Sequence, residues 1–438
     1  MRRQAARVFL APAALRRLFC RGYAGSGGGL LVRLPQSQRP GARLARAPQA
    51  RAAAAASEEE VVKVSKQRHE SLLGSEIVHF QRALEPHPIS LQQILALRDA
   101  EKLRLFLLEE LPIRFAHRLT MVESLPDWHS FPHMRMIRTL YSNSFQRLRV
   151  VSKSDAELFR STLQTIKRRN SNMLQHVVRG VRSMKEASPA LGDDRVNDFL
   201  DSFLTARIGS EILSSQYLAL TNPGGPTSAI DPLCDPLDII HQAAGEAARL
   251  CRHYYDGYAA PVHVSNAQQV RFPFIPQYLR YIMFEILKNS MRAVAERYPG
   301  QEAERHPISV VVCGDEDSVV VRVSDEGGGI SVRDVPKIWS YLFTTAKPQG
   351  QTNASSVYDD SDSDSEEESV APMAGFGCGL PLSRNYASYV GGSLQLNAVP
   401  DHGVDVYLYM NRLGNAREYE GKGAKLGLGL PSRGYILH

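Results

Sequence analysis

Residues 285–292 read EILKNSMR, residues 325–329 read DEGGG, and residues 375–381 read GFGCGLP. The first stretch falls on a predicted helix, the second follows a predicted strand, and the third leads into another helix. Each stretch by itself is common, but their order, spacing and predicted supports are hard to obtain together by chance. Because a glycine-rich helix start exposes backbone N–H groups, the three stretches predict one nucleotide-binding site.

The helix that carries the first stretch is expected over residues 277–297, where Glu285, Asn289 and Arg292 are spaced i, i+4 and i+7. This spacing places the three side chains on one helix face. The Asn289 carbonyl oxygen is a hard ligand that suits Mg²⁺ already bound by phosphates. Glu285 can accept a proton from an attacking hydroxyl, and Lys288 or Arg292 can neutralise phosphate charge. For this segment alone, an ordinary amphipathic surface helix is the alternative.

Asp325 stands at the end of a strand expected over residues 319–324 and before three glycines. A carboxylate fixed at a strand end can accept the amino group of adenine, while Gly327 and Gly329 let the backbone approach the ring without a Cβ. A simple turn is the alternative for this stretch alone. The interpretation as a site is favoured because Asp325 follows Asn289 by 36 residues, behind a predicted hairpin.

The third stretch precedes a helix expected over residues 381–389. Its free N–H groups and the positive end of the helix dipole favour phosphate. It is neither a Walker A loop nor a Rossmann fingerprint, because the Gly-Lys-Ser/Thr ending and the final glycine spacing are missing. Thr344 and Thr345 precede an insert in the lid over this site. Cys378 is interpreted as a small residue tolerated between glycines, with a redox-sensitive thiol as the alternative.

Residues 235–412 alternate between strand and helix patterns. Strands are expected at residues 262–264, 269–272, 308–313, 319–324, 393–396 and 404–410. Together with the intervening helices they predict an α/β sandwich, in which helices cover one face of a mixed sheet. The glycine- and lysine-rich tail at residues 413–438 is expected to be loose.

Helical periodicity dominates residues 65–220. Helices are expected at residues 90–111, 132–149, 156–186 and 195–220. Long helices with short connections predict an antiparallel bundle. The Pro- and Gly-rich residues 221–234 predict a linker, so the expected fold class is α + α/β, an N-terminal helical bundle followed by the sandwich domain.

Residues 349–370 differ in composition from the rest of the sandwich domain. Seven acids lie in this segment, interleaved with Ser361, Ser363 and Ser365. Such a segment is too polar to pack and predicts a solvated, disordered insert within the lid. Phosphorylation of the serines is an alternative to a plain mobile loop.

The first 56 residues hold eleven arginines and no Asp, Glu or Lys. An acid-free start rich in Arg and Ala predicts a mitochondrial transit peptide and disordered leader, with a basic tail for nucleic acid or anionic membrane as the alternative. Without these arginines the net charge of +6 becomes −5, so nucleic acid is not an expected partner. No apolar run reaches the roughly 18 residues that span a bilayer. The five cysteines show no metal or disulfide spacing, which favours reduced thiols in a matrix-like compartment.

The three nucleotide segments resemble those of gyrase, heat-shock protein 90 and histidine kinases, the GHKL ATPase superfamily. The chain as a whole resembles the mitochondrial pyruvate and branched-chain 2-oxoacid dehydrogenase kinases over about residues 91–412. Beyond the ATP segments, residues 111–118 read LPIRFAHR, residues 198–209 read DFLDSFLTARIG and residues 250–255 read LCRHYY. These stretches lie in the bundle and at its junction, so the resemblance is specific at the family level.

This resemblance implies a protein serine/threonine kinase that uses ATP and Mg²⁺ to phosphorylate, and so inactivate, the E1α subunit of the pyruvate dehydrogenase complex. It also implies a matrix location, a homodimer, and docking of the bundle to the lipoyl domain of E2. Glu285 would be the general base, Asn289 the Mg²⁺ ligand and Asp325 the adenine partner. The residues that would line the nucleotide are Ile286, Leu287, Lys288, Asn289, Ser290, Met291, Arg292, Ala293, Asp325, Gly327, Gly329, Thr344, Thr345, Gly375, Phe376, Gly377, Cys378, Gly379 and Leu380.

Several details bear on which of the two complexes is the substrate. Tyr281 stands where pyruvate-type kinases usually have His four residues before the base, and the Asp-Trp pair of many C-terminal tails is missing. Asn170 stands where both types usually have His. Residues 116–118 and 272–276 lean to the branched-chain type, whereas residues 324–330, 373–375 and 411–414 look like the plant pyruvate dehydrogenase kinase. The pyruvate complex is therefore favoured, with the branched-chain complex as the alternative.

Two functions from other classes are also considered. A histidine kinase would need a phosphoacceptor His on a dimerisation helix, and none of the thirteen His has that setting. A non-catalytic ATP-binding scaffold would not need Glu285 and Asn289, which are both present. Serine transfer is therefore the preferred interpretation.

Overall fold

The computed structural model describes residues 30–33, 61–222, 228–266, 270–345 and 377–418. Several sequence predictions fall outside these ranges and are not tested by the structure. They concern the leader apart from residues 30–33, linker residues 223–227, the acidic insert at 349–370, Gly375, Phe376 and the tail beyond residue 418.

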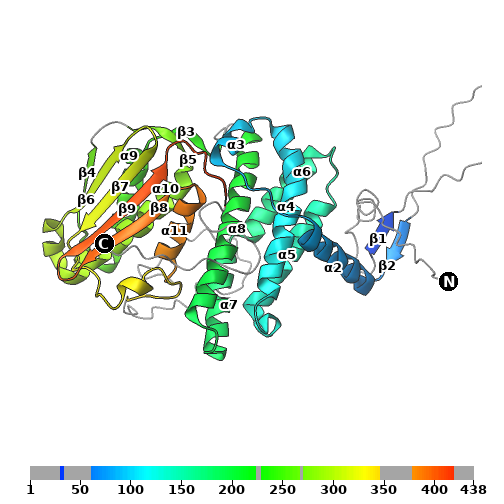
Figure 1. Ribbon diagram of the computed structural model, residues 1–438, viewed down its shortest axis with the longest axis horizontal. Helices are drawn as coiled ribbons and strands as arrows, with labels where there is room; N and C mark the ends of the chain where they lie inside the picture. The colour runs from blue at the N-terminus through cyan, green and yellow to red at the C-terminus, as the bar shows by residue number, and fades with distance from the viewer. Residues whose placement is uncertain (1–29, 34–60, 223–227, 267–269, 346–376, 419–438) are drawn as a thin grey trace, which may run out of the picture.

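The N-terminal half of the described chain is a bundle of helices (Figure 1). Its helices are α2 (Lys66–Ala83), α3 (Leu91–Ala96), α4 (Ala100–Glu123), α5 (Pro132–Arg149), α6 (Ala156–Arg169), α7 (Met173–Ala187) and α8 (Asp193–Leu220), with a short 3₁₀ turn η2 (Trp128–Ser130) before α5. Apolar residues at helical spacing form its core, which includes Leu107, Phe145 and Phe203, all fully buried. Within the described residues no helix is long and apolar enough to cross a membrane.

Two of the expected bundle helices are each divided in the structure. The helix expected over 90–111 breaks before Ala100 because the Asp99 side chain accepts from the N–H groups of Glu101 and Lys102 and starts α4. The helix expected over 156–186 ends at Asn170, after which α7 begins at Met173. The Asp99 cap thus decided the first of these boundaries, whereas α7 begins without a side-chain cap.

The C-terminal half is a five-stranded mixed sheet with helices on one face, and the expected fold class is confirmed. The strands, in the order β4-β6-β7-β9-β8, are β4 (Val262–Asn266), β6 (Ile308–Gly314), β7 (Ser318–Asp325), β9 (Gly403–Asn411) and β8 (Ser393–Val399). β4 and β6 are parallel, and the other pairs are antiparallel. The remaining elements are α9 (Pro236–Tyr254), α10 (Pro276–Arg297), η3 (Gly300–Arg305), η4 (Val335–Lys337) and α11 (Gly379–Tyr389).

The alternating burial of the sheet shows which face the helices cover. Val319, Val321 and Val323 of β7 are buried, while the residues between them are partly exposed. Helix α10 contacts β6 and β7, α11 contacts β8 and β9, and α9 packs against α10. Because successive side chains of a strand point to opposite faces of the sheet, the buried residues of β7 mark the face that the helices cover.

The structure has two short strand pairs that the sequence did not predict as pairs. β3 (Asp231–Cys234), in the expected linker, pairs with β5 (Phe272–Phe274), and the strand expected over 269–272 thus begins later. β1 (Leu30–Arg33), in the expected leader, pairs with β2 (Val61–Val64). Apolar and β-branched residues explain the second pair, since they suit strands even when the surrounding composition is that of a leader.

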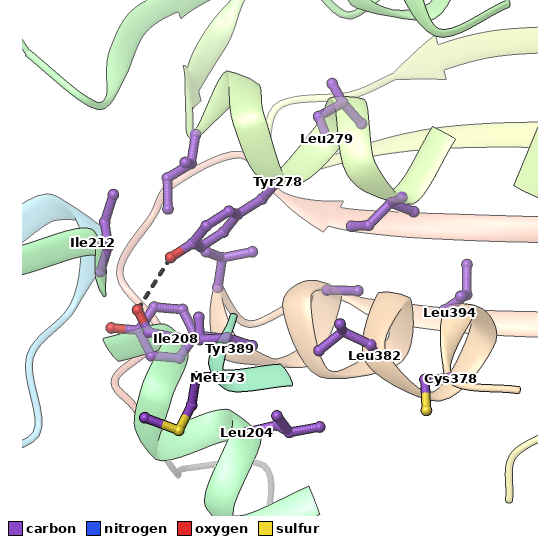
Figure 2. Packing of buried hydrophobic residues seen from close by; sticks show 14 of the residues in the cluster. Met173, Leu204, Ile208, Ile212, Tyr278, Leu279, Cys378, Leu382, Tyr389 and Leu394 are labelled. Carbon is purple, nitrogen blue, oxygen red and sulfur yellow. Dashed lines mark hydrogen bonds between the residues drawn. The ribbon is translucent and has the colours of Figure 1, made fainter. Parts of the chain in front are cut away.

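The bundle and the sandwich domain share one continuous core, formed by α8, α10 and α11 (Figure 2). The hydroxyl of Tyr278 on α10 donates to the carbonyl of Ile208 on α8, with 3.1 Å between the oxygens. Leu204 of α8 and Leu382 and Tyr389 of α11 belong to the same buried cluster (Figure 2). The junction is therefore packed rather than a flexible hinge between two domains.

Residues 412–418 return from β9 to the bundle, where the sequence predicted a loose tail. The N–H of Gln92 donates to the carbonyl of Gly414 at 2.9 Å, and the N–H of Glu418 donates to Ile89 at 3.2 Å. The Glu418 side chain is fully buried and accepts two hydrogen bonds from Arg114, at 3.0 and 2.7 Å. The prediction of a loose tail is therefore wrong for residues 413–418, because an ion pair that is distant in sequence holds this segment.

Candidate nucleotide site

A cavity of about 420 Å³ lies between α10, the end of β7, the start of α11 and the edge of β8 and β9. It gathers most of the residues expected to line a nucleotide. These are Glu285, Ile286, Lys288, Asn289, Ser290, Arg292, Ala293, Asp325, Gly327, Gly329, Thr344, Thr345, Gly377, Gly379 and Leu380. The three sequence segments, which lie between residues 285 and 380, thus meet around one space.

Among the expected lining residues that the structure describes, three do not reach the cavity. Leu287 and Met291 are fully buried on the opposite face of α10, in the hydrophobic core. Cys378 is buried in the same core, and burial raises the pKa of its thiol to about 11. A thiol that stays protonated is a poor nucleophile, so the structure favours the packing role of Cys378 over the redox alternative.

Asp325 is held at the floor of the cavity by two hydrogen bonds. The Ser290 hydroxyl donates to its Oδ2 at 2.8 Å, and the N–H of Gly327 donates to its Oδ1 at 3.0 Å. Burial raises the pKa of the Asp325 carboxyl, and these two donors oppose the rise. A fixed carboxyl in an apolar surrounding can recognise a donor group such as an exocyclic amine.

Glu285 and Lys288 form an ion pair on the cavity wall. Lys288 Nζ donates to Glu285 Oε1 at 2.7 Å, and only 12% of the Glu285 side chain and 8% of the Lys288 side chain are exposed. Gly379 lies against the other carboxylate oxygen so closely that a Cβ at this position would overlap Oε2. Tyr281, one turn earlier on α10, is half-buried and packs against Tyr386.

Gly377 sets the backbone conformation of the third segment just before α11. It has φ of +74°, and a Cβ there would lie 2.6 Å from the carbonyl oxygen of Phe343. Its own carbonyl accepts from the N–H of Leu342 at 3.1 Å. Only glycine suits this backbone, which brings the glycine segment against the loop that carries Thr344 and Thr345.

Sequence reasoning missed the apolar part of the cavity and its edge. The additional lining residues are Glu296, Arg297, Ile330, Ile338, Phe343, Pro381, Leu396, Val404 and Val406. Val404 and Val406 alternate along β9, which indicated an inward face but not the ligand that this face meets. Arg297 donates to the carbonyls of Asp401 and His402 at 2.8 and 2.9 Å, and so fixes the loop before β9.

Asn289 is the candidate protein ligand for a divalent cation, and the described residues provide no cluster of carboxylates beside it. In the described part of the chain no group of three or more His, Cys, Asp or Glu side chains could hold a metal. Mg²⁺ typically binds through one or two protein oxygens together with phosphates and water. The donor set at Asn289 therefore fits a metal that arrives with a nucleotide.

The fold and the cavity define an ATP-binding domain of the histidine kinase, gyrase B and HSP90 class. A family model described as "Histidine kinase-, DNA gyrase B-, and HSP90-like ATPase" matches residues 275–414. A second model, described as "Mitochondrial branched-chain alpha-ketoacid dehydrogenase kinase", matches residues 88–231 and so covers most of the bundle.

Whole-chain relatives identify the family. A mitochondrial pyruvate dehydrogenase (acetyl-transferring) kinase of Arabidopsis thaliana is 33% identical over 321 residues, which cover 72% of this chain and 85% of the relative. Isozyme 1 of Rattus norvegicus is 30% identical over 77% of this chain and 80% of its own length. A kinase of the same name from Schizosaccharomyces pombe is 34% identical over 59% of this chain and 60% of the relative. The chain belongs to the mitochondrial 2-oxoacid dehydrogenase kinase family, and it is a protein kinase that binds ATP.

Proposed function

We propose that this kinase phosphorylates serine on the E1α subunit of the mitochondrial pyruvate dehydrogenase complex and thereby inactivates it. The observation that carries this proposal is the cavity in which Glu285, Asn289 and Asp325 meet, on a chain whose relatives are named for that complex. The branched-chain complex is the second candidate, because the model that matches the bundle carries the branched-chain name.

The residues of the cavity suggest a division of roles. Asp325 would accept the adenine amino group, while Leu396, Val404 and other apolar residues would cover the ring. Asn289 would hold Mg²⁺, which when bound neutralises charge on the phosphates. Glu285, on the same helix face, would take the proton of the substrate serine as general base.

The rest of the molecule would serve docking and assembly. The bundle at residues 65–220 would bind the lipoyl domain of E2, while residues 235–412 form the kinase domain and carry the acidic lid insert. The enzyme would be a homodimer in the mitochondrial matrix, with residues 1–56 as transit peptide and leader. These assignments rest on the family, whose named relatives are mitochondrial.

Transfer of ³²P from labelled ATP to purified E1 of each complex tests the substrate. We expect label on serine of the pyruvate E1α by the parent chain, and label only on the branched-chain E1 would move the assignment to that complex. Asn289→Ala should lose Mg²⁺-dependent ATP binding. Glu285→Gln should bind ATP and lose transfer, and Glu296→Gln, on the same cavity wall, is the matched control. No label on either E1 would support the scaffold alternative.

A further inference from the structure

The proposed general base is paired through one of its oxygens and closely packed at the other in this structure. Oε1 of Glu285 accepts from Lys288 at 2.7 Å, and Oε2 faces the backbone of Gly379, where there is no space for a Cβ. Both side chains of the pair are nearly buried. The Lys288 ammonium therefore occupies one of the two oxygens through which the carboxylate could meet a substrate hydroxyl.

The Lys288 ammonium has two neighbours on its own helix, α10. Its ammonium is held by Glu285 and lies 5.3 Å from the centre of the Phe284 ring. The lysine lines the cavity, and its flexible stem lets the ammonium turn toward another acceptor. The same ammonium can therefore neutralise the carboxylate or a phosphate, and the cavity provides the room for the exchange.

We propose that the triphosphate of ATP itself releases the base, by drawing Lys288 away from Glu285. A triphosphate carries several negative charges, and hydrogen bonds from an ammonium to phosphate are strong. Glu285 is left without its partner once a nucleotide is seated and is then able to accept the serine proton. Without nucleotide the pair keeps the carboxylate occupied. This inference rests on the proposed function of the cavity and adds to it a substrate-dependent exchange of one lysine.

The neighbouring pair of Arg292 and Glu296 offers a comparison within the same cavity. Arg292 Nε lies 3.6 Å from Glu296 Oε1, and about half of the Glu296 side chain is exposed. Because this contact is longer and more exposed to solvent, breaking it should require little free energy. Removal of the Glu296 charge therefore reports on general repulsion between a wall carboxylate and phosphates, without the release of Lys288.

The first test measures binding of ATP and of adenosine to the parent, Glu285→Gln and Glu296→Gln chains by calorimetry. Glu285→Gln should bind ATP about 3- to 10-fold more tightly than the parent, because no carboxylate holds Lys288 back. Adenosine, which has no phosphate, should bind the three chains equally. Equal ATP affinity for Glu285→Gln and Glu296→Gln would overturn the exchange. No ATP binding by the parent would instead overturn the proposed function.

The second test separates KM from kcat at position 288. Lys288→Met should raise the KM for ATP about 10- to 100-fold, as expected for the loss of a charged hydrogen bond to phosphate, and should change kcat at saturating ATP by less than about 3-fold. Lys288→Arg should restore most of the affinity. A fall in kcat with an unchanged KM would overturn the proposal. It would mean that Lys288 stays paired with Glu285 during turnover and positions the carboxylate. Thermal unfolding of each variant shows that it is folded.

Discussion

Two buried ion pairs, one at the junction and one in the cavity, have similar geometry and different surroundings. Lys288 and Glu285 meet at 2.7 Å, as do Arg114 and Glu418. The junction pair is fully buried and neither of its residues lines the nucleotide cavity, while both residues of the cavity pair line it. The comparison shows that burial alone does not separate a structural ion pair from a functional one. The free volume beside the pair does, because only there can a ligand replace a partner.

The junction pair is further fixed by a network. Arg114 Nε donates to Glu110 at 2.7 Å, and Arg114 NH2 donates to the carbonyl of His87 at 2.8 Å. The Tyr389 hydroxyl at the end of α11 donates to Glu418. Gly209 on α8 leaves the space for this network, since a Cβ there would lie 2.6 Å from both Arg114 NH1 and Glu418 Oε1. The guanidinium thus joins the bundle to the tail segment with nearly all of its donors occupied.

The largest effect is expected when the junction pair is broken. Arg114→Met leaves the carboxylates of Glu110 and Glu418 buried without their cation, which should cost about 3–5 kcal/mol of stability. Chemical unfolding measures the loss, and Arg138→Met is the control because its pair with Glu123 is partly exposed. A loss for Arg114→Met no greater than that for Arg138→Met would refute the structural role of the junction pair.

Asp325→Asn should weaken ATP binding and spare the fold. Loss of the charged acceptor for adenine should lower the affinity about 10- to 100-fold. Burial raises the pKa of Asp325 in the folded state above its value in the unfolded state. The folded state therefore binds the proton more tightly. The parent loses stability as the pH rises from the unfolded-state pKa to the folded-state pKa. The asparagine variant lacks this loss. Thermal unfolding without nucleotide should therefore show the variant at least as stable as the parent at neutral pH, and a large drop in its melting temperature would contradict this account.

The cavity pair should contribute less to stability than the junction pair. Lys288→Met leaves Glu285 beside an open cavity, where water can solvate the carboxylate, so a loss of about 1 kcal/mol is expected. Urea unfolding of this variant beside Arg114→Met measures the difference directly. A loss as large as that of Arg114→Met would remove the distinction between an exchangeable pair and a structural one.

The smallest effect is expected at the surface. Lys153 and Glu109 also meet at 2.7 Å, but about half of each side chain is exposed. Glu109→Gln should change the unfolding free energy by less than about 0.5 kcal/mol, because water and salt screen such a pair. Measurement at low and high salt completes the series, and a cost above that of Lys288→Met would show that solvent access does not order the three pairs.

The sequence predicted the sandwich domain better than the junction. The expected strand over 308–313 and the helix over 277–297 agree with β6 and α10 to within one residue at each end. Local patterns suffice there, because side-chain periodicity reports directly on the buried face. The pairing of Glu418 with Arg114 spans 304 residues, and no local pattern marks a charge in a glycine- and lysine-rich tail as buried.

Within the cavity, the limits of prediction follow the same rule. Helical spacing placed Glu285 and Asn289 on one face, whereas Leu287 and Met291 were included only because they lie in the same segment. Cys378 was included for the same reason, although its side chain turns into the core. A motif names a stretch of backbone, and only the packing shows which of its side chains reach the ligand.

The sequence by itself determined the order of the main helices and strands, the family, and the helix face that carries the carboxamide and the carboxylate. Those features depend on interactions between residues a few positions apart. The tertiary structure alone decided that Lys288 forms an ion pair with Glu285, that residues 412–418 return to the bundle, and which apolar side chains complete the cavity. The reason is physical: burial and ion pairing depend on distances between segments that only the folded chain brings together.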